Sequence, residues 1–270
     1  MTTLEAELAR HDRWYHTIEL PGGRLTPGLY DMQKALRHVG LPASLEGQRC
    51  LDIGTADGFW AFEMEKRGAR EVVAFDLDSW EHLDWPPSEG SSAERGNRPI
   101  SPGFALARDA LGSRVEWAGG SIYDLSPERE GEFDFVFIGS MLLHLRDPVR
   151  ALAAVHSVTR STLQVNEAIA AGLTALGPRY PAARLVGQAV PTWWVANPAG
   201  LRRMLEAAGF VVTETGRPYY LRYGPGRRTA DEPTLRPVSM RPLRALPLSL
   251  VRNGLDRLGR PHVWLRALAR

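Results

Sequence analysis

The sequence predicts an α/β protein built on one doubly wound, mostly parallel sheet. From residue 49 onward, apolar runs of strand length alternate with segments of helix length. Two successive runs end on an acidic residue, and a glycine-containing turn and a helix follow the first of them. Because crossovers between parallel strands are right-handed, this pattern places the ligand-binding ends of the strands at one edge of the sheet.

Seven strands and six helices are expected, which fits a Rossmann-like seven-stranded sheet. The strands are expected at residues 49–53, 71–75, 115–118, 133–138, 161–166, 211–215 and 262–267. The helices are expected at residues 4–14, 31–39, 59–67, 104–111, 149–159 and 198–208.

The whole chain, residues 1–270, is interpreted as a single domain. Its expected parts are an N-terminal cap (1–46), a core (47–225) and a C-terminal arm with the last strand (226–270). Within the cap, residues 18–30 are expected to form a loop. Residues 79–104 interrupt the α/β order and are interpreted as a mobile lid or a surface loop.

The turn after the first strand carries the most specific pattern in the chain. It reads Asp-x-Gly-x-Ala-x-Gly and contains Asp52, Gly54, Thr55, Ala56 and Gly58. Small residues let backbone N–H groups approach a ligand, and the next helix begins there with its partially positive end. A dinucleotide pyrophosphate prefers a Gly-x-Gly-x-x-Gly turn without a neighbouring anion, so Asp52 favours a positively charged ligand instead.

The second strand ends at Asp76, roughly 20 residues after the turn, where a doubly wound sheet binds the two hydroxyls of a ribose. A carboxylate accepts both hydroxyl protons, and each charge-assisted hydrogen bond contributes about 1.5–3 kcal/mol. The two acids and two glycines together favour a nucleoside site over two incidental surface acids.

These motifs resemble those of the class I S-adenosylmethionine-dependent methyltransferases, in which an acid precedes a glycine-rich turn and a second acid binds the ribose. More specifically, the chain resembles methyltransferases related to the tRNA wobble-uridine modifying enzymes, and their shorter actinobacterial relatives, which include enzymes suited to sugar hydroxyls in polymethylated polysaccharide synthesis. Four segments carry this resemblance in order, at residues 51–64, 133–137, 142–148 and 194–198. Ala56 departs from the family pattern, which has glycine there.

The resemblance implies S-adenosylmethionine as the methyl donor and S-adenosylhomocysteine as the product. It also implies further cofactor-binding residues. Leu77 lies next to the ribose acid, Ser121 and Ile122 take the place of the adenine-binding pair, and Gly139 leaves room for the methionine part. Ser121 stands where the family commonly has an acid, which predicts a weaker hold on the adenine amine.

His144, a few residues beyond the fourth strand, is the candidate catalytic base. Histidine titrates near pH 6.5 and can accept a hydroxyl proton at neutral pH, an effect of about 10²–10⁴ in rate. The alternative is a histidine that caps the next turn or packs against Asp147. Because an unactivated hydroxyl needs a base more than a free amine does, this histidine favours O-methylation.

Five residues are candidates for binding the acceptor: Tyr15, His16, Glu167, Trp194 and Asn197. Aromatic faces beside hydrogen-bonding groups suit sugar rings, and they also suit stacked bases. Each aromatic residue has an alternative role in packing the cap against the core. Glu167 has three readings, which are to orient His144, to bind a hydroxyl, or to join a histidine on a divalent ion, although no standard metal spacing is present.

Composition is that of an ordinary globular enzyme, with 44% apolar and 24% charged residues. The sequence contains neither a run of 18 apolar residues nor a secretory leader pattern, so a cytoplasmic protein without membrane insertion is expected. The single cysteine, Cys50, lies in an expected buried strand and is interpreted as a core residue.

The net charge of +2 is unevenly distributed, because residues 217–270 hold 12 arginines against three acids. Either this arginine-rich segment packs on the acidic remainder of the chain, or it contacts an anionic substrate or nucleic acid. The expected function is O-methylation of a small polar acceptor, a mannoside or another carbohydrate. The alternatives are a tRNA-modifying methyltransferase, disfavoured by only two lysines in the chain, and a non-enzymatic cofactor sensor.

Overall fold

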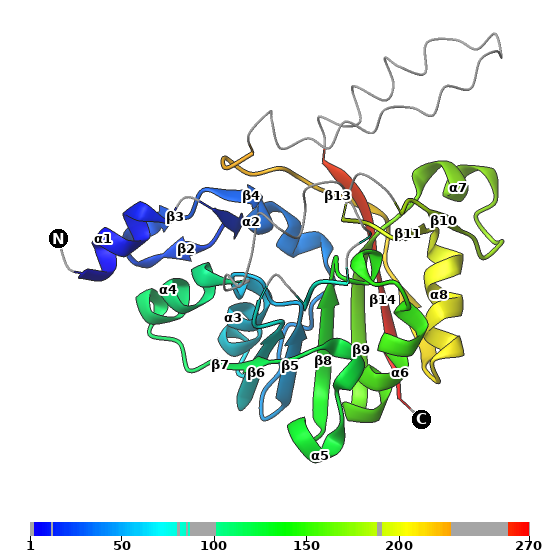
Figure 1. Cartoon of the computed structure of the whole chain (residues 1–270), viewed down its shortest axis with the longest axis horizontal. Coiled ribbons are helices and arrows are strands. Elements are labelled where there is room, and N and C mark those ends of the chain that lie inside the picture. The colour runs from blue at the N-terminus through cyan, green and yellow to red at the C-terminus, as the bar shows by residue number, and fades with distance from the viewer. Residues whose placement is uncertain are drawn as a thin grey trace, which may run out of the picture.

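A computed structural model describes residues 3–11, 13–79, 82–84, 86, 101–187, 191–227 and 259–269. A central sheet runs through the molecule, with helices on both faces and an N-terminal cap above the upper edge in Figure 1. Most of the expected lid, and residues 228–258 of the expected arm, lie outside the described part of the chain.

The sheet has the order β12-β14-β9-β8-β5-β6-β7, and β13 pairs with β14. Its strands are β5 (Arg49–Ile53), β6 (Glu71–Asp76), β7 (Glu116–Gly119), β8 (Phe133–Gly139), β9 (Thr159–Ala168), β12 (Val211–Thr215), β13 (Tyr219–Leu221) and β14 (Arg260–Leu268). Strands β5 to β9 are parallel, whereas β14 is antiparallel to its neighbours. All seven expected strands are confirmed, and the fold class with them. The short strand β13 was not expected.

Alternation along the buried strands divides the core between the two faces of the sheet. Leu51 and Ile53 of β5 face a cluster that includes α6 (Pro148–Val158) and α8 (Pro198–Ala207), whereas Cys50 faces a cluster that includes α3 (Phe59–Lys66) and α4 (Pro102–Leu111). Cys50 is fully buried, and burial raises the pKa of its thiol to about 12, as expected for a core residue. No helix among the described residues is long and apolar enough to cross a membrane.

The N-terminal cap differs from the expected helix at residues 4–14, loop at residues 18–30 and helix at residues 31–39. It comprises α1 (Thr3–Arg10), β1 (Trp14–His16), β2 (Glu19–Leu20), η1 (Pro21–Gly23), β3 (Arg24–Leu25), β4 (Gly28–Tyr30), α2 (Met32–Ala35) and η2 (Leu36–His38). The helix expected at residues 4–14 ends at Arg10, and strand β1 begins at Trp14. Trp14 and His16 are both buried, and their spacing of two residues is the period of a strand. Strand β1 pairs in parallel with β4, where a side chain on Gly28 would come within 2.1 Å of the His16 carbonyl carbon.

Short elements that follow β7, β8 and β9 complete the fold. These elements are η4 (Ile122–Asp124), α5 (Pro127–Glu130), η5 (Leu142–His144), α7 (Ala171–Leu176), β10 (Ala183–Leu185) and β11 (Trp194–Ala196). Each of them is six residues or fewer, which is too short for a periodic sequence pattern.

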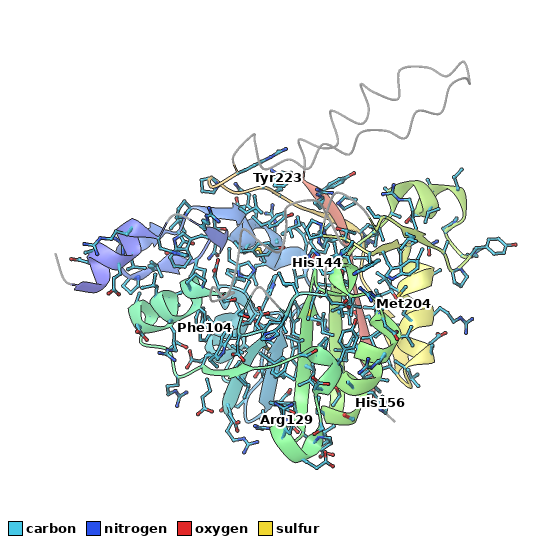
Figure 2. All side chains as sticks on the ribbon, in the orientation of Figure 1. Phe104, Arg129, His144, His156, Met204 and Tyr223 are labelled. Carbon is cyan, nitrogen blue, oxygen red and sulfur yellow. The ribbon has the colours of Figure 1, made fainter. Side chains whose placement is uncertain are left out.

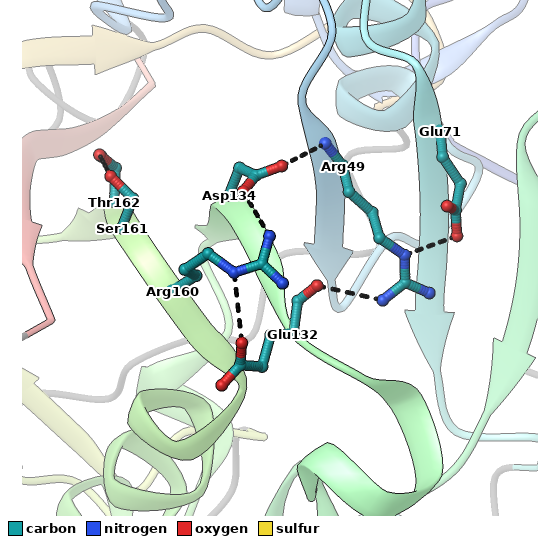
Figure 3. Close-up of polar contacts among 7 residues, drawn as sticks. All are labelled: Arg49, Glu71, Glu132, Asp134, Arg160, Ser161 and Thr162. Carbon is teal, nitrogen blue, oxygen red and sulfur yellow. Dashed lines mark hydrogen bonds and ion pairs between the residues drawn. The ribbon is translucent and has the colours of Figure 1, made fainter.

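An ion-pair network holds the amino-terminal ends of the parallel strands together (Figure 3). Arg49 donates from its backbone N–H to Asp134 and from its guanidinium to Glu71 at 2.7 Å. Asp134 also accepts from Arg160 at 2.9 Å, and these hydrogen bonds hold the pKa of Asp134 below its usual value. The network fixes the register of β5, β6, β8 and β9 at the edge opposite the glycine-containing turn.

Replacing Arg49 should therefore destabilise the protein. The Arg49→Ala variant loses the Glu71 pair, a 2.7 Å bond to the Glu130 carbonyl, and a guanidinium 4.1 Å from the Phe133 ring centroid. We expect a loss of about 1–3 kcal/mol in the free energy of unfolding, measured by urea denaturation. Arg114→Ala is the control, because that side chain is 82% exposed and its ion pair should contribute little. Equal losses in the two variants would contradict the account.

Candidate active site

The turn after β5 has a backbone that favours glycine. Gly54 and Gly58 have φ values of +72° and +89°, and Ala56 has a φ of +47°. A residue with a side chain in this left-handed region costs about 1–2 kcal/mol, so Ala56 carries strain where the resembling family has glycine. Such strain often occurs at ligand-binding turns.

Asp52 stabilises this turn from inside. It is 1% exposed, and its Oδ2 accepts from the Thr55 hydroxyl at 2.7 Å and the Ala61 N–H at 3.1 Å. These bonds connect the end of β5 to the first turn of α3. The Asp52 carboxylate therefore holds the shape of the turn, and the Thr55 hydroxyl is occupied by Asp52.

Asp76 lies at the carboxyl end of β6, beside the same turn. Its Oδ2 accepts from the Ala56 N–H at 3.0 Å, and its Oδ1 accepts from the Leu77 N–H at 2.8 Å. The carboxylate thus bridges the turn and the end of the strand. This is the position that the sequence predicts for a ribose acid.

Asp57 is a third carboxylate at the turn, and the sequence analysis missed it. It is 4% exposed, and its Oδ2 accepts from the backbone N–H groups of Tyr15 at 2.6 Å and His16 at 2.9 Å. Asp57 therefore fastens strand β1 of the cap to the turn. Its acidity within a turn of small residues was the signal that could have identified it.

The three acidic groups place up to three negative charges around the turn. Burial raises the pKa of Asp52 to about 7 and those of Asp57 and Asp76 to about 6, although their hydrogen bonds partly oppose the shift. None of the ion pairs within the described residues involves any of the three. A ligand with ammonium and sulfonium charges fits this environment, whereas a pyrophosphate does not.

The loop after β7 contains the expected adenine-binding pair. The Ser121 hydroxyl accepts from the Tyr123 N–H at 3.3 Å and caps η4, while Ile122 is 2% exposed and belongs to the core. The Gly120 N–H donates to the carbonyl of Asp76 at 2.9 Å. This bond keeps the loop next to the end of β6.

His144 ends η5, just beyond β8, at the upper edge of the sheet in Figure 2. Its Nδ1 bonds to the backbone carbonyl of Pro191, and since a carbonyl can only accept, Nδ1 carries the proton. Burial lowers the pKa of His144, so the ring is neutral at pH 7 and its Nε2 has the lone pair. A neutral imidazole of this tautomer has the chemistry of a general base.

Glu167, near the end of β9, positions the loop that carries His144. It is 1% exposed, and its Oε1 accepts from the N–H groups of Met141 and Leu142, each at 2.7 Å. Burial raises its pKa to about 7. Of its three expected roles, support of the His144 loop agrees best with these bonds, and it acts there through the backbone.

Two further acceptor candidates, Trp194 and Asn197, differ in what they can still bind. Trp194 is half-buried and donates its indole N–H to the carbonyl of Arg146 at 3.0 Å. Asn197 is fully buried and uses both amide atoms to hold Gly177, Tyr180, Ala182 and Gly200, capping α8. Asn197 is therefore committed to the fold and leaves the candidate acceptor set.

A small cavity lies between the cap, the ends of β8 and β9, and β13. Its wall includes Gly139 together with Tyr15, His16, Trp60, Ser140, Asn166 and Tyr219. Burial, Tyr30 and Glu167 raise the pKa of Tyr15, so its phenol stays protonated. The structure thus brings two predicted acceptor residues, Tyr15 and His16, to the glycine predicted for the cofactor.

Within the described ranges, no group of three or more histidine, cysteine or acidic residues is arranged to hold a metal ion.

The fold is that of a class I S-adenosylmethionine-dependent methyltransferase. Three features define it, namely the sheet order with its antiparallel β14, the strained turn after β5 and the acid that ends β6. The family described as the methyltransferase domain matches residues 29–215, and the chain belongs to this family. Its cofactor is S-adenosylmethionine.

Among characterised proteins, the chain is 24% identical over 116 residues to the ubiquinone biosynthesis O-methyltransferase of Acinetobacter baumannii. That match covers 43% of this chain and 41% of the relative, so it spans less than half of either protein.

Solved structures share the fold over most of their length. The N-terminal domain of EvdMO1, determined in the presence of S-adenosylhomocysteine and D-fucose, has a TM-score of 0.55 at 15% identity and covers 98% of this chain and 94% of that one. The [4+2]-cyclase SpnF has a TM-score of 0.51 at 19% identity, with coverages of 98% and 90%. A putative methyltransferase from Bacillus halodurans has a TM-score of 0.51 at 15% identity, with coverages of 88% and 98%. These likenesses establish the fold and not the acceptor.

The affinity for S-adenosylmethionine should increase between about pH 5.5 and pH 8. A bound cation favours the ionised carboxylates, whose raised pKa values of about 6 to 7 leave them largely protonated at the lower pH. Each carboxyl whose pKa falls by one unit on binding contributes about tenfold in affinity. Titration calorimetry at both pH values should give a smaller change for S-adenosylhomocysteine, which lacks the sulfonium charge. The same pH dependence for both ligands would refute this electrostatic role.

Proposed function

We propose that this protein transfers a methyl group from S-adenosylmethionine to a hydroxyl of a small polar acceptor, most specifically a mannoside or another carbohydrate. The supporting observation is the cavity at the carboxyl ends of β8 and β9. Its wall combines aromatic rings of Tyr15, Trp60 and Tyr219 with polar groups, and it includes Gly139. Aromatic faces pack on the apolar C–H faces of sugars, and the polar groups bind their hydroxyls.

In this proposal, Asp76 binds the ribose with Leu77 next to it, and the Asp52 to Gly58 turn surrounds the charged methionine part. Ser121 and Ile122 bind the adenine, and Gly139 leaves space between cofactor and acceptor. The hydrogen bonds of Asp76 to Ala56 and Leu77 keep its carboxylate at the end of β6. The family resemblance and this placement support the assignment.

The cofactor, when bound, supplies a methyl group already activated by the sulfonium. The protein then has to align the acceptor oxygen, exclude water and remove one proton. We assign proton removal to Nε2 of His144, because the Pro191 carbonyl fixes the opposite nitrogen as the donor. His144 is not among the residues that line the cavity, so this assignment rests on its tautomer and on its place just beyond β8. Glu167 keeps the loop of His144 in place through Met141 and Leu142.

Methylation of tRNA is the second candidate, and the arginine-rich segment 217–270 favours it. Two described arginines of that segment contact the protein itself. Arg266 pairs with Glu214 at 2.7 Å, and Arg260 donates to the Tyr223 hydroxyl at 3.2 Å. Retention of bulk tRNA at low and moderate salt tests this candidate, since phosphate contacts weaken steeply with salt. No retention at either salt concentration would eliminate it.

A screen with methyl-labelled S-adenosylmethionine tests the proposed function. The acceptors are sugars, methyl glycosides, small phenols and tRNA, each with a no-protein control. We expect label in at least one sugar or glycoside and none in tRNA. Label only in tRNA or only in phenols would overturn the carbohydrate proposal.

A further inference from the structure

Ser140 occupies an unusual position directly after β8. Its φ is +54°, so it and Ala56 are the two described non-glycine residues with positive φ. The Ser140 N–H donates to the Asn166 carbonyl at 2.8 Å, which holds the residue in this conformation, and Ser140 is one of the residues that line the cavity. A strained serine at a cavity wall indicates a functional constraint on the hydroxyl.

The Ser140 hydroxyl is paired with His262 of β14, whose Nε2 lies 2.8 Å from the Ser140 Oγ. Nδ1 of His262 lies 2.9 Å from the Arg260 carbonyl, so Nδ1 carries a proton and donates. Burial lowers the pKa of His262 to about 4, which leaves Nε2 unprotonated at neutral pH. The hydroxyl of Ser140 therefore donates to His262, and the oxygen lone pairs of Ser140 are directed to other partners.

The same cavity contains a second indication of a polar ligand. His16 is 3% exposed and lines the cavity, yet its Nδ1 is buried and has no hydrogen-bond partner among the described residues. A buried polar atom without a partner costs about 1–3 kcal/mol. Burial lowers the pKa of His16 to about 3, so the ring is neutral and can accept or donate a hydrogen bond according to its tautomer.

We propose that this cavity is a polyol subsite, in which Ser140, oriented by His262, accepts a hydrogen bond from one hydroxyl of the acceptor and His16 pairs with a second hydroxyl. The inference rests on the proposed function and makes it more specific, because it requires an acceptor with at least two hydroxyls. Ser140 and His16 contact the acceptor, whereas His262 is a positioning residue that acts through Ser140. Neither hydrogen bond includes a covalent step, so His144 keeps its proposed role as the base.

Binding can be measured without methyl transfer, by saturation-transfer NMR on protein saturated with S-adenosylhomocysteine. The probes are the methyl glycosides of mannose, glucose and galactose, with cyclohexanol as a ring-matched probe that has one hydroxyl. We expect at least one glycoside to bind the wild-type protein. If none binds, or if cyclohexanol binds as well as the best glycoside, the polyol subsite is excluded.

The Ser140→Gly variant removes the hydroxyl and accepts the positive φ without strain. The variant should bind the best glycoside about tenfold more weakly than wild type, as expected for one lost hydrogen bond to a polar partner. Its affinity for cyclohexanol should be unchanged. Ser161→Ala is the control, because that exposed serine lies at the opposite end of β9 and should bind like wild type. Equal glycoside binding in Ser140→Gly and wild type would overturn the proposal.

Two histidine variants separate this role from a purely structural one. His16→Phe should raise the melting temperature, because it removes a buried polar atom without a partner. The same variant should bind the glycoside more weakly than wild type. His262→Gln keeps a hydrogen-bond acceptor for Ser140, so it should bind the glycoside more tightly than His262→Ala does. Unchanged glycoside binding in His16→Phe would contradict the two-point contact. Methyl transfer by a protein that fails these tests would leave the proposed function standing and remove only the subsite.

Discussion

Replacing His144 should lower methyl transfer by about 10²–10⁴ and leave the affinity for S-adenosylmethionine unchanged. His144→Asn is the preferred variant, because its amide N–H can replace the bond from Nδ1 to the Pro191 carbonyl but cannot act as a base. Single-turnover rates with labelled cofactor measure the loss, and calorimetry measures binding. His156→Gln is the matched control, since His156 lies on α6 away from His144 (Figure 2) and should keep wild-type activity.

The pH dependence provides a second test of His144. A base must be neutral, and burial lowers the pKa of this histidine from its usual 6.5. With the protein saturated by S-adenosylmethionine, the rate should therefore be constant between about pH 7 and pH 8 and should fall only at a pH below 6.5. Full turnover in His144→Asn, or a rate that is halved near pH 7.5, would mean that another group accepts the proton.

Replacing Asp76 has the second largest expected effect, which is a loss of cofactor affinity. The Asp76→Ala variant removes the carboxylate that accepts from Ala56 and Leu77 and that would accept from the ribose hydroxyls. Charge-assisted hydrogen bonds contribute about 1.5–3 kcal/mol, so binding should weaken by about ten- to a hundredfold in calorimetry.

Asp78→Ala is the control for Asp76, because Asp78 is an exposed carboxylate two residues further along the chain. Its binding should stay within about twofold of wild type, as expected for an exposed charge. Equal affinities of Asp76→Ala and wild type would place the ribose elsewhere. A comparable loss in Asp78→Ala would indicate a general charge effect.

The sheet could be predicted from the sequence because its information is local. Apolar runs mark β5, β8 and β9, and the two acids mark the edge at which they end. Strand β13 has only three residues, too few for a periodic pattern. The prediction of the N-terminal cap was wrong for a different reason. Strand β1 is held by β4 and by Asp57, which is 41 and 42 residues from its two donors, and no local pattern encodes such contacts.

The same contrast between local patterns and long-range contacts applies to the candidate site. Asp76 follows from a strand end and a spacing, whereas Ser140 and His262 are 122 residues apart and meet only because β14 pairs with β9. Asn197 looked like a binding residue because of the neighbouring tryptophans. An asparagine directly before a proline is also a common helix start, and the structure uses it that way.

The central claim is that the protein consumes its cofactor to methylate a hydroxyl. The measurement that tests it most directly is the stoichiometry of S-adenosylhomocysteine formed against methyl ether formed, with the best glycoside of the screen. We expect one molecule of S-adenosylhomocysteine for each methyl ether, and neither product without the glycoside. If the protein binds S-adenosylmethionine and leaves it intact with every acceptor, it is a cofactor-binding protein of this fold and the account is wrong.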